Sequence, residues 1–343
     1  MQTTKANELY AGADLHGNNV FLSVCDHNGG NVFRKRVKAD LNAVNAALDP
    51  FWGRIAALGV ESTFNWYWLV DGLREQGRPV KLGNPAKMAQ YQGIKITNDL
   101  TDADWLAEQL RAGIFPECYV YPKEQRAVRD ALRRRQLFVQ RRIQVVLSFG
   151  GLMERYGQTP PNSAKLQKWT VEDIRGTGLD PLVQLQLETL LDAIHESGRQ
   201  AERIERRVLE EVGPMDAYRR IQLIPGIGVI LGMTILLESG DFKRFPTAGD
   251  YASYCRTVKS ERTSNEKKKG SNNAKNGNKY LAWAFVEAAT FAARFNPQIH
   301  AWYERKKAVS GMAKARKALA NKLAKAVWHV MNGKDFDLKL MFG

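Results

Sequence analysis

The sequence contains few of the residues that bind zinc or form disulfide bonds. Its three cysteines, Cys25, Cys118 and Cys255, lie far apart, and its five histidines are equally scattered. Zinc sites usually combine such residues in pairs at short spacing, and no two cysteines or two histidines of this chain are paired in that way. We therefore expect the cysteines to be reduced and structural, and we expect no zinc site.

Long apolar runs are also absent. A membrane-spanning helix is indicated by about 18 or more consecutive apolar residues, and the chain has no such run. The N-terminal residues lack the hydrophobic stretch of a secretory signal peptide. These absences argue against a membrane partner and predict a cytoplasmic protein.

Acidic residues are outnumbered by basic ones. The 343 residues include 51 Lys plus Arg against 36 Asp plus Glu, which gives a formal net charge of +15. Such an excess favours a strongly negative partner, with nucleic acid as the leading candidate, over a small neutral substrate. The length exceeds that of a usual single domain, so we expect two or three compact units.

The first third of the chain has the pattern of an α/β sheet. Short apolar strands are expected at 9–16, 20–26, 31–38, 55–61, 79–83 and 117–121. Short polar turns join the first three strands, as in antiparallel hairpins, and helices separate the later ones, as in crossover connections. This is the order of an RNase H-like sheet, although the pattern alone fits other α/β sheets nearly as well.

After Pro122 the pattern becomes helical. Residues 123–157 are predicted to form one long helix, and 181–212 a second one with apolar residues at spacings of three and four. The two helices suit an antiparallel hairpin or an oligomerising coiled coil. We expect three units: an α/β unit at 1–121, a long-helix spacer at 122–213 and a mainly helical unit at 214–343.

Four acidic residues are candidates for one site on the α/β unit. Asp14 lies on a strand on the face opposite its apolar residues, and Glu61 ends a second strand. Asp99 and Asp102 are three residues apart at the start of a helix, so both project from one side. Asp104 lies two residues beyond Asp102 and points elsewhere on the helix, so it is excluded.

Neighbouring carboxylates favour a metal ion. Like charges raise one another's pKa, and a cation relieves this repulsion. Magnesium prefers oxygen ligands, and two Mg²⁺ ions about 4 Å apart can activate the attacking oxygen and stabilise the leaving oxygen of a phosphodiester. The alternative is that Asp99 and Asp102 form a helix N-terminal charge pair and that Asp14 and Glu61 are ordinary strand-end acids.

Several short segments also resemble a known family. They are Gly-Ala-Asp at 12–14, Val-Glu-Ser-Thr at 60–63, Asn-Asp-Leu-Thr-Asp-Ala at 98–103, Leu-Ile-Pro-Gly-Ile-Gly at 223–228, Ser-Asn at 264–265 and Lys-Asn-Gly-Asn at 275–278. In this order and spacing they resemble the DEDD transposases, which are insertion-sequence recombinases guided by a bridge RNA. The resemblance covers nearly the whole chain.

The resemblance implies a fold and a mechanism. It implies a RuvC-like nuclease domain at 1–121, whose four acids hold metal, and a C-terminal transposase domain at 214–343 with a helix-hairpin-helix. It implies that Ser264 attacks DNA to form a covalent phosphoserine intermediate. The family commonly has Ser-Gly where this chain has Ser-Asn at 264–265, so Ser260 and Ser271 stay open as alternatives. The family also usually has Lys-Thr-Asp where this chain has Thr-Asn-Asp at 97–99, which leaves the acids intact.

Nucleic-acid contacts are expected in three places. Gly226 and Gly228 would let backbone N–H groups approach a phosphate, unless their segment is an ordinary helix–helix turn. The basic residues expected to contact nucleic acid, from the long helix and from the lysine-rich segment, are Arg133, Arg134, Arg141, Lys267, Lys268, Lys269 and Lys275.

The distribution of charge also predicts a partner. The basic residues extend over long segments, which suits backbone contact, and no zinc-finger or basic-zipper signature for base readout is present. We therefore expect a guide noncoding RNA to supply site specificity, as the resemblance also implies. Double-stranded donor and target DNA would be the substrates. A dimer or tetramer with composite active sites is expected, because the acids and Ser264 lie far apart in the chain.

Two other interpretations stay open. In the first, the protein is a RuvC-like structure-specific endonuclease, whose acids activate water and whose Ser264 has no role. In the second, it is a non-catalytic nucleic-acid-binding protein with structural acids. A trapped protein–DNA adduct separates the recombinase from the first, and magnesium-dependent strand cleavage eliminates the second.

Overall fold

A computed structural model describes residues 7–88, 102–258, 262–264, 267–270 and 276–342. Contacts between residues divide the chain into two compact units, Met1–Lys123 and Glu124–Gly343. Each unit is described by itself below. The further boundary expected at residue 213, between a spacer and a C-terminal domain, stays a prediction.

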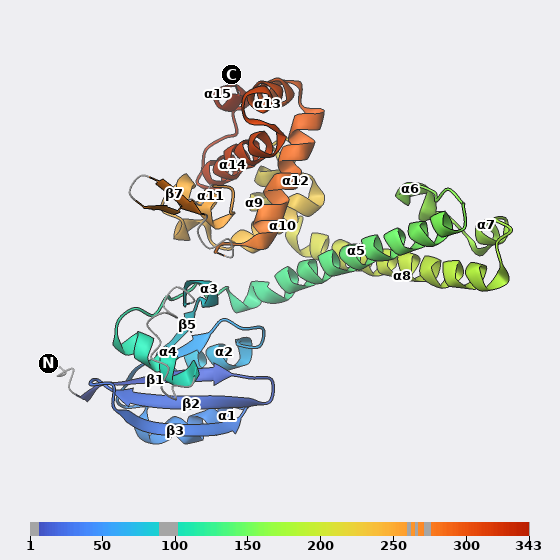
Figure 1. Ribbon diagram of the computed structural model, residues 1–343. Helices are drawn as coiled ribbons and strands as arrows, with labels where there is room; N and C mark the ends of the chain where they lie inside the picture. The colour runs from blue at the N-terminus through green and yellow to red at the C-terminus, as the bar shows by residue number, and fades with distance from the viewer. Residues whose placement is uncertain (1–6, 89–101, 259–261, 265–266, 271–275, 343) are drawn as a thin grey trace. The chain divides into compact units, whose positions relative to one another are not determined.

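The first unit is built on a mixed five-stranded sheet (Figure 1). Its strands are β1 (Leu9–Leu15), β2 (Asn19–Asp26), β3 (Asn31–Lys38), β4 (Ile55–Glu61) and β5 (Val80–Gly83), in the order β3-β2-β1-β4-β5. The first three strands pair antiparallel, and β4 runs parallel to both β1 and β5. This is the order and direction expected for an RNase H-like sheet.

The prediction of a strand at 117–121 is wrong. That segment makes a single antiparallel bridge, between Gly83 and Glu117, and lies outside the sheet. Pro116 and Pro122 flank it. Because proline has no N–H to donate, a strand between two prolines cannot extend its ladder in either direction.

The two faces of this sheet are covered differently. Alternate residues of β1, from Leu9 to Leu15, pack in a core with α1 (Leu41–Leu48) and α2 (Tyr67–Glu75). The opposite face carries α4 (Asp102–Arg111), which contacts β1, β2 and β4. The short elements η2 (Asp49–Phe51) and α3 (Pro85–Met88) complete the described part of the unit.

Helix α4 lies unusually close to β1 because of a glycine. A Cβ added at Gly12 would lie 1.9 Å from the Ala103 carbonyl oxygen and 2.8 Å from the Ala107 nitrogen. Gly59, the neighbour of Gly12 in β4, likewise leaves room for Leu110 and Phe115. The absence of side chains at Gly12 and Gly59 therefore sets how closely α4 packs on the sheet.

The second unit begins with two long helices that pack against each other. Helix α5 (Lys123–Arg155) and helix α8 (Pro181–Val212) form an antiparallel hairpin, joined through α6 (Ser163–Leu166) and α7 (Val171–Arg175) (Figure 1). Apolar residues of both helices form common clusters, and Arg135 pairs with Glu205 at 3.0 Å. Of the two arrangements expected for these helices, the structure shows the hairpin within one chain.

The rest of the second unit is mainly helical around one large core. Its helices are α9 (Asp216–Gln222), α10 (Val229–Ser239), η4 (Phe242–Arg244), α11 (Ala248–Tyr254), α12 (Lys279–Phe295), α13 (Pro297–Ser310), α14 (Met312–Met331) and α15 (Leu338–Phe342). Two short strands, β6 (Arg262–Ser264) and β7 (Lys267–Gly270), form an antiparallel pair that the sequence pattern did not predict. All three cysteines are free, as expected. Of the helices in the described ranges, none is long and apolar enough to cross a membrane.

The contact at Gly12 gives a first prediction. Gly12→Ala should destabilise the protein by about 1–3 kcal/mol, because the added methyl group must push α4 away from β1. Gly17→Ala is the matched control, since a Cβ there meets nothing within 4 Å. Urea unfolding of both variants measures the difference. A Gly12→Ala variant as stable as the Gly17→Ala variant would contradict the close approach.

Candidate active site

Two acidic side chains lie next to each other at the ends of parallel strands. Gly12 pairs with Gly59 and Ala13 with Val60, so Asp14 and Glu61 follow one step later in adjacent strands. Each lies two residues beyond a glycine that faces α4, so both carboxylates are on the α4 face of the sheet. Both side chains are half-buried.

Helix α4 brings a third acid to this edge. Asp102 is its first residue and directly precedes Ala103, whose carbonyl oxygen touches the backbone at Gly12. Burial raises the pKa of Glu61, and the negative charges of Asp102 and then Asp14 raise it further. The three carboxylates therefore interact electrostatically, and ionised Glu61 is destabilised in this setting.

The fourth predicted acid, Asp99, lies outside the described residues. Within the described ranges, no three Asp, Glu, His or Cys side chains are arranged closely enough to hold one metal ion. The chemistry of the set nonetheless fits a hard divalent cation, because three carboxylates supply oxygen ligands and a cation would relieve the repulsion at Glu61. The acids are neighbours, and their role as metal ligands stays a prediction.

Asp14 has a partner that the sequence analysis did not single out. His16 Nε2 lies 3.0 Å from the Asp14 carboxylate, and the Asn65 side chain donates to the His16 backbone oxygen at 2.8 Å. The spacing of two residues was the available signal, since such neighbours project to the same side of an extended chain. His16 is therefore placed to orient this carboxylate.

Asp104 points away from this cluster, as expected for a residue two positions beyond Asp102. It is buried, accepts a hydrogen bond from Ser23 Oγ and pairs with Arg34 Nε at 2.8 Å. An ionised carboxylate buried to this extent needs such partners. Asp104 therefore ties α4 to β2 and β3.

Ser264 ends β6 and faces Lys267 across the short antiparallel pair. The backbones of Lys268 and Lys269 belong to β7. The side chains of all four residues, and Lys275 altogether, lie outside the described residues. The predicted roles of this serine and these lysines therefore stay predictions.

Packing explains the glycine at position 226 of the turn between α9 and α10. Gly226 has a φ of +88°, and a Cβ there would lie 2.3 Å from the Ala288 carbonyl oxygen of α12. Only glycine fits such a conformation and contact. Gly228 is exposed with open space around it at the start of α10, so it is the glycine better placed to approach a ligand.

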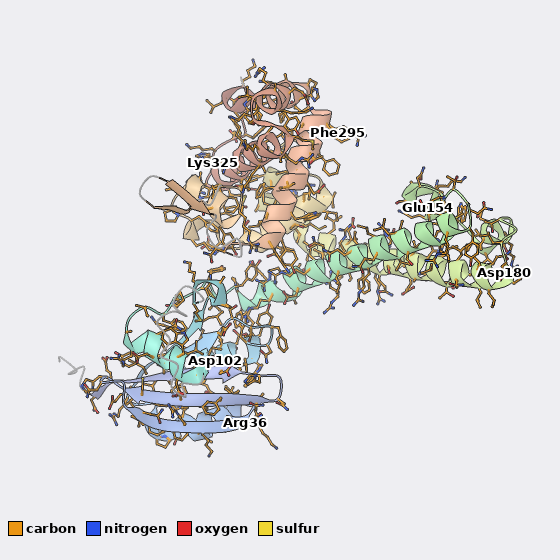
Figure 2. All side chains as sticks on the ribbon, viewed as in Figure 1. Arg36, Asp102, Glu154, Asp180, Phe295 and Lys325 are labelled. Atoms are coloured by element: carbon orange, nitrogen blue, oxygen red, sulfur yellow. The ribbon has the colours of Figure 1, made fainter. Side chains whose placement is uncertain are left out.

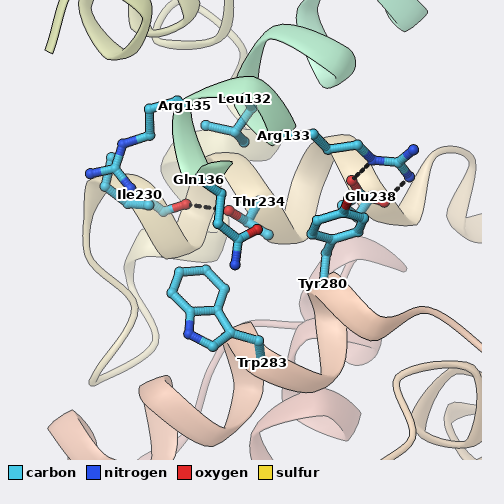
Figure 3. A pocket seen from close by; sticks show the side chains of 9 residues that line it. All are labelled: Leu132, Arg133, Arg135, Gln136, Ile230, Thr234, Glu238, Tyr280 and Trp283. Carbon is cyan, nitrogen blue, oxygen red and sulfur yellow. Dashed lines mark hydrogen bonds and ion pairs between the residues drawn. The ribbon is translucent and has the colours of Figure 1, made fainter. Parts of the chain in front are cut away.

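The arginines of α5 differ among themselves. Arg133 donates to both carboxylate oxygens of buried Glu238, at 2.6 and 2.7 Å, and stacks over the Tyr280 ring (Figure 3). Asn278 donates to the same carboxylate at 2.7 Å and caps α12. Arg133 therefore has a structural partner, whereas Arg134 and Arg141 are exposed.

The chain is similar to proteins of insertion sequences. Residues 11–157 match the family DEDD_Tnp_IS110, described as Transposase, and residues 218–304 match Transposase_20, the Transposase IS116/IS110/IS902 family. The transposase for insertion sequence element IS1111A of Coxiella burnetii is 23% identical over 94% of this chain and 90% of its own length. The transposase for IS1328 of Yersinia enterocolitica is 22% identical over 94% and 97%.

The raised pKa of Glu61 predicts a response to metal. The folded state holds the Glu61 proton more tightly than the unfolded state, so stability present at low pH is lost as pH rises through the folded pKa. Glu61→Gln should therefore unfold at a higher temperature than wild type at pH 7.5 without divalent metal. This difference should vanish in acid, below about pH 4, where Glu61 is protonated in both states.

Magnesium should reverse that order. At ten times its Kd it should stabilise the wild type by roughly 1.4 kcal/mol, and Glu61→Gln by much less. Glu75→Gln is the control, since Glu75 is exposed and pairs with Lys123 at the surface, at 2.6 Å. Differential scanning calorimetry with and without MgCl₂ makes the comparison. Equal magnesium shifts in wild type and Glu61→Gln would contradict the metal site.

Arg133 gives a third prediction. Arg133→Ala should lower the free energy of unfolding by about 1.5–3 kcal/mol, because it removes two hydrogen bonds from the buried Glu238 carboxylate. Arg134→Ala and Arg141→Ala should change stability by less than about 0.5 kcal/mol. Guanidinium unfolding distinguishes them. If all three variants unfold alike, Arg133 is not the structural residue of the set.

Proposed function

Because this chain belongs to the DEDD transposases of insertion sequences, a family that cleaves DNA and transfers strands with divalent metal ions, we propose that it is an RNA-guided, magnesium-dependent recombinase. Its product would be rejoined DNA, made through a covalent phosphoserine intermediate. The proposal assigns the acids of the sheet edge and Ser264 to one phosphodiester. It deepens the family's activity by naming the residues of this chain.

The observation that carries the proposal is the raised pKa of the Glu61 carboxyl group. Its pKa is raised by burial, by Asp102 at the start of α4 and by Asp14 on the neighbouring strand β1. Asp14, Glu61, Asp99 and Asp102 would hold Mg²⁺, two ions per site. When bound, the metal would stabilise the charge that develops on the phosphate oxygens. His16 would hold the Asp14 carboxylate in place through their 3.0 Å contact.

The proposed nucleophile is Ser264. Its Oγ would attack phosphorus and lose its proton, while the bond to the departing sugar oxygen breaks and that oxygen gains a proton. The phosphoserine would conserve the bond energy, and a second sugar hydroxyl would later displace the serine and rejoin the strand. Lys267, Lys268, Lys269 and Lys275 would neutralise the phosphates around it.

The proposed partners follow from the charge of the chain. Arg134 and Arg141 are exposed on α5, and Gly228 is exposed at the start of α10, so these residues can meet phosphates. Arg133 is a weaker candidate for a phosphate contact than Arg134 and Arg141, since Glu238 already binds it. A helix-hairpin-helix role for α9 and α10, a guide RNA, a dimer or tetramer with composite sites, and a cytoplasmic location all belong to the proposal.

The main rival is a structure-specific endonuclease in which the same acids activate water. The fourth prediction separates the two. Wild-type protein purified together with the element's noncoding RNA, then mixed with magnesium and DNA of the element's ends, should give a protein–DNA adduct that survives denaturing gel electrophoresis. Ser264→Ala should still bind DNA and give no adduct, while Ser260→Ala and Ser271→Ala should give the wild-type amount.

A recombination assay tests the guide RNA. Protein purified from cells that express the element's noncoding flanks should recombine donor and target plasmids, and RNase treatment should abolish this activity. Site-specific recombination by RNA-free protein would defeat RNA guidance. Cleavage without any adduct in the wild type would favour the endonuclease, and cleavage by Asp14→Ala at the wild-type rate would remove the acids from the mechanism.

A further inference from the structure

A row of basic side chains lies on the same face of the sheet as the acids. Arg34 reaches Asp104 of α4, so it is on the α4 face, whereas Phe33 and Val37 pack in the core on the other side. Alternation along β3 then puts Arg36 and Lys38 on the face of Arg34. All three are exposed. Figure 2 labels Arg36 on β3 and Asp102 at the start of α4.

The pairing of the strands aligns this row with the acids. Asp14 pairs with Phe21, and Phe21 pairs with Arg36, so the three residues form one line across β1, β2 and β3. Successive side chains on one face of a strand are roughly 6.8 Å apart. That is close to the distance between successive phosphates of an extended single strand, so successive phosphates of one strand can lie beside Arg36 and Lys38.

A cavity opens at the Arg34 end of the row. It measures about 350 Å³ and lies between α4 and the β2–β3 hairpin. This is within the range of about 300–1,000 Å³ for small-molecule sites. The lining residues that bear on its chemistry are Cys25, Arg34, Asp104, Trp105, Glu108 and Arg111.

The lining is polar, aromatic and balanced in charge. Arg34 pairs with Asp104 at 2.8 Å, and Arg111 Nε donates to Glu108 at 2.7 Å. Burial raises the pKa of Cys25 to about 11, so its thiol is neutral. A cavity of this kind suits a flat, neutral group with several hydrogen-bonding atoms better than it suits a phosphate. The half-buried Trp105 ring supplies a surface for stacking.

We propose that β3 and this cavity form a binding track for an unpaired DNA strand, with phosphates along Arg36 and Lys38 and one base inserted beside Trp105. The track would lead the strand across the α4 face toward the line of Asp14. The bound strand would be DNA, because DNA is what the family cleaves. The inserted base would give the protein a preference at one position. This inference rests on the proposed function only for the use of the strand, since binding is measured without metal.

The phosphate contacts are tested by salt dependence. Fluorescence anisotropy with a labelled single-stranded DNA oligonucleotide, in EDTA, measures the affinity of the full chain. Arg36→Ala should reduce the slope of log K against log salt by about 0.7, the effect of one lost phosphate contact. Lys35→Ala is the matched control, because Lys35 is also exposed and lies on the opposite face of β3, the face of Phe33 and Val37. Equal slopes for the two variants overturn the track.

The base site is tested by an abasic scan. Each oligonucleotide in a series lacks one base, and wild-type protein should lose affinity about tenfold at a single position. Trp105→Ala should bind the intact strand as weakly as wild type binds that abasic strand, and should lose nothing further there. Trp105→Phe should keep most of the affinity, and its result stands in if Trp105→Ala does not fold.

The remaining outcomes each overturn the proposal. No sensitive abasic position in wild type removes the inserted base. An RNA strand of the same sequence that binds more tightly, with the same dependence on Arg36 and Trp105, assigns the track to RNA instead of DNA. Since no cleavage is measured, failure of binding is distinct from failure of the nuclease or serine chemistry.

Discussion

Helix α4 can approach β1 and β4 only because Gly12 and Gly59 carry no side chains on the face that it covers. This contact places Asp102, the residue before Ala103, over the strand ends that carry Asp14 and Glu61. The same approach places Asp104 on the other side of the helix, where Ser23 and Arg34 hold it. The packing of α4 on the sheet thus separates two groups of acids. The carboxylates of Asp14, Glu61 and Asp102 repel one another, whereas that of Asp104 is neutralised by Arg34.

The second unit uses a similar arrangement at a different place. Glu238 of α10 is buried, and two residues from separate elements satisfy it: Arg133 of the long hairpin and Asn278 at the start of α12. Asn278 also caps α12 through the backbone of Tyr280 and Leu281. Asn278, the residue that precedes α12, and Arg133 of the hairpin are thereby held by the same carboxylate. A buried carboxylate is costly unless it is paired, so these contacts favour one arrangement of the helices.

The sequence predicted the regular elements well and the long-range partners poorly. Five strands and both long helices followed from periodicity, whereas the strand at 117–121 was wrong because prolines flank it. The β6–β7 pair was missed because a segment rich in Lys, Gly and Asn shows no apolar alternation. Adjacency of Asp14 and Glu61 could be expected from parallel strands. The pairing of Arg133 with Glu238 could not, since 105 residues separate them and nothing local marks the pair.

The central claim is that the acids of β1, β4 and α4 bind divalent metal as a unit. Electron paramagnetic resonance of Mn²⁺ added to the full chain counts the bound ions directly, without DNA or RNA. The account predicts about two bound ions per chain, with binding lost or strongly weakened in Asp14→Asn and Asp102→Asn and unchanged in Glu75→Gln. Mn²⁺ binding that is the same in all four proteins, or absent from the wild type, would contradict it.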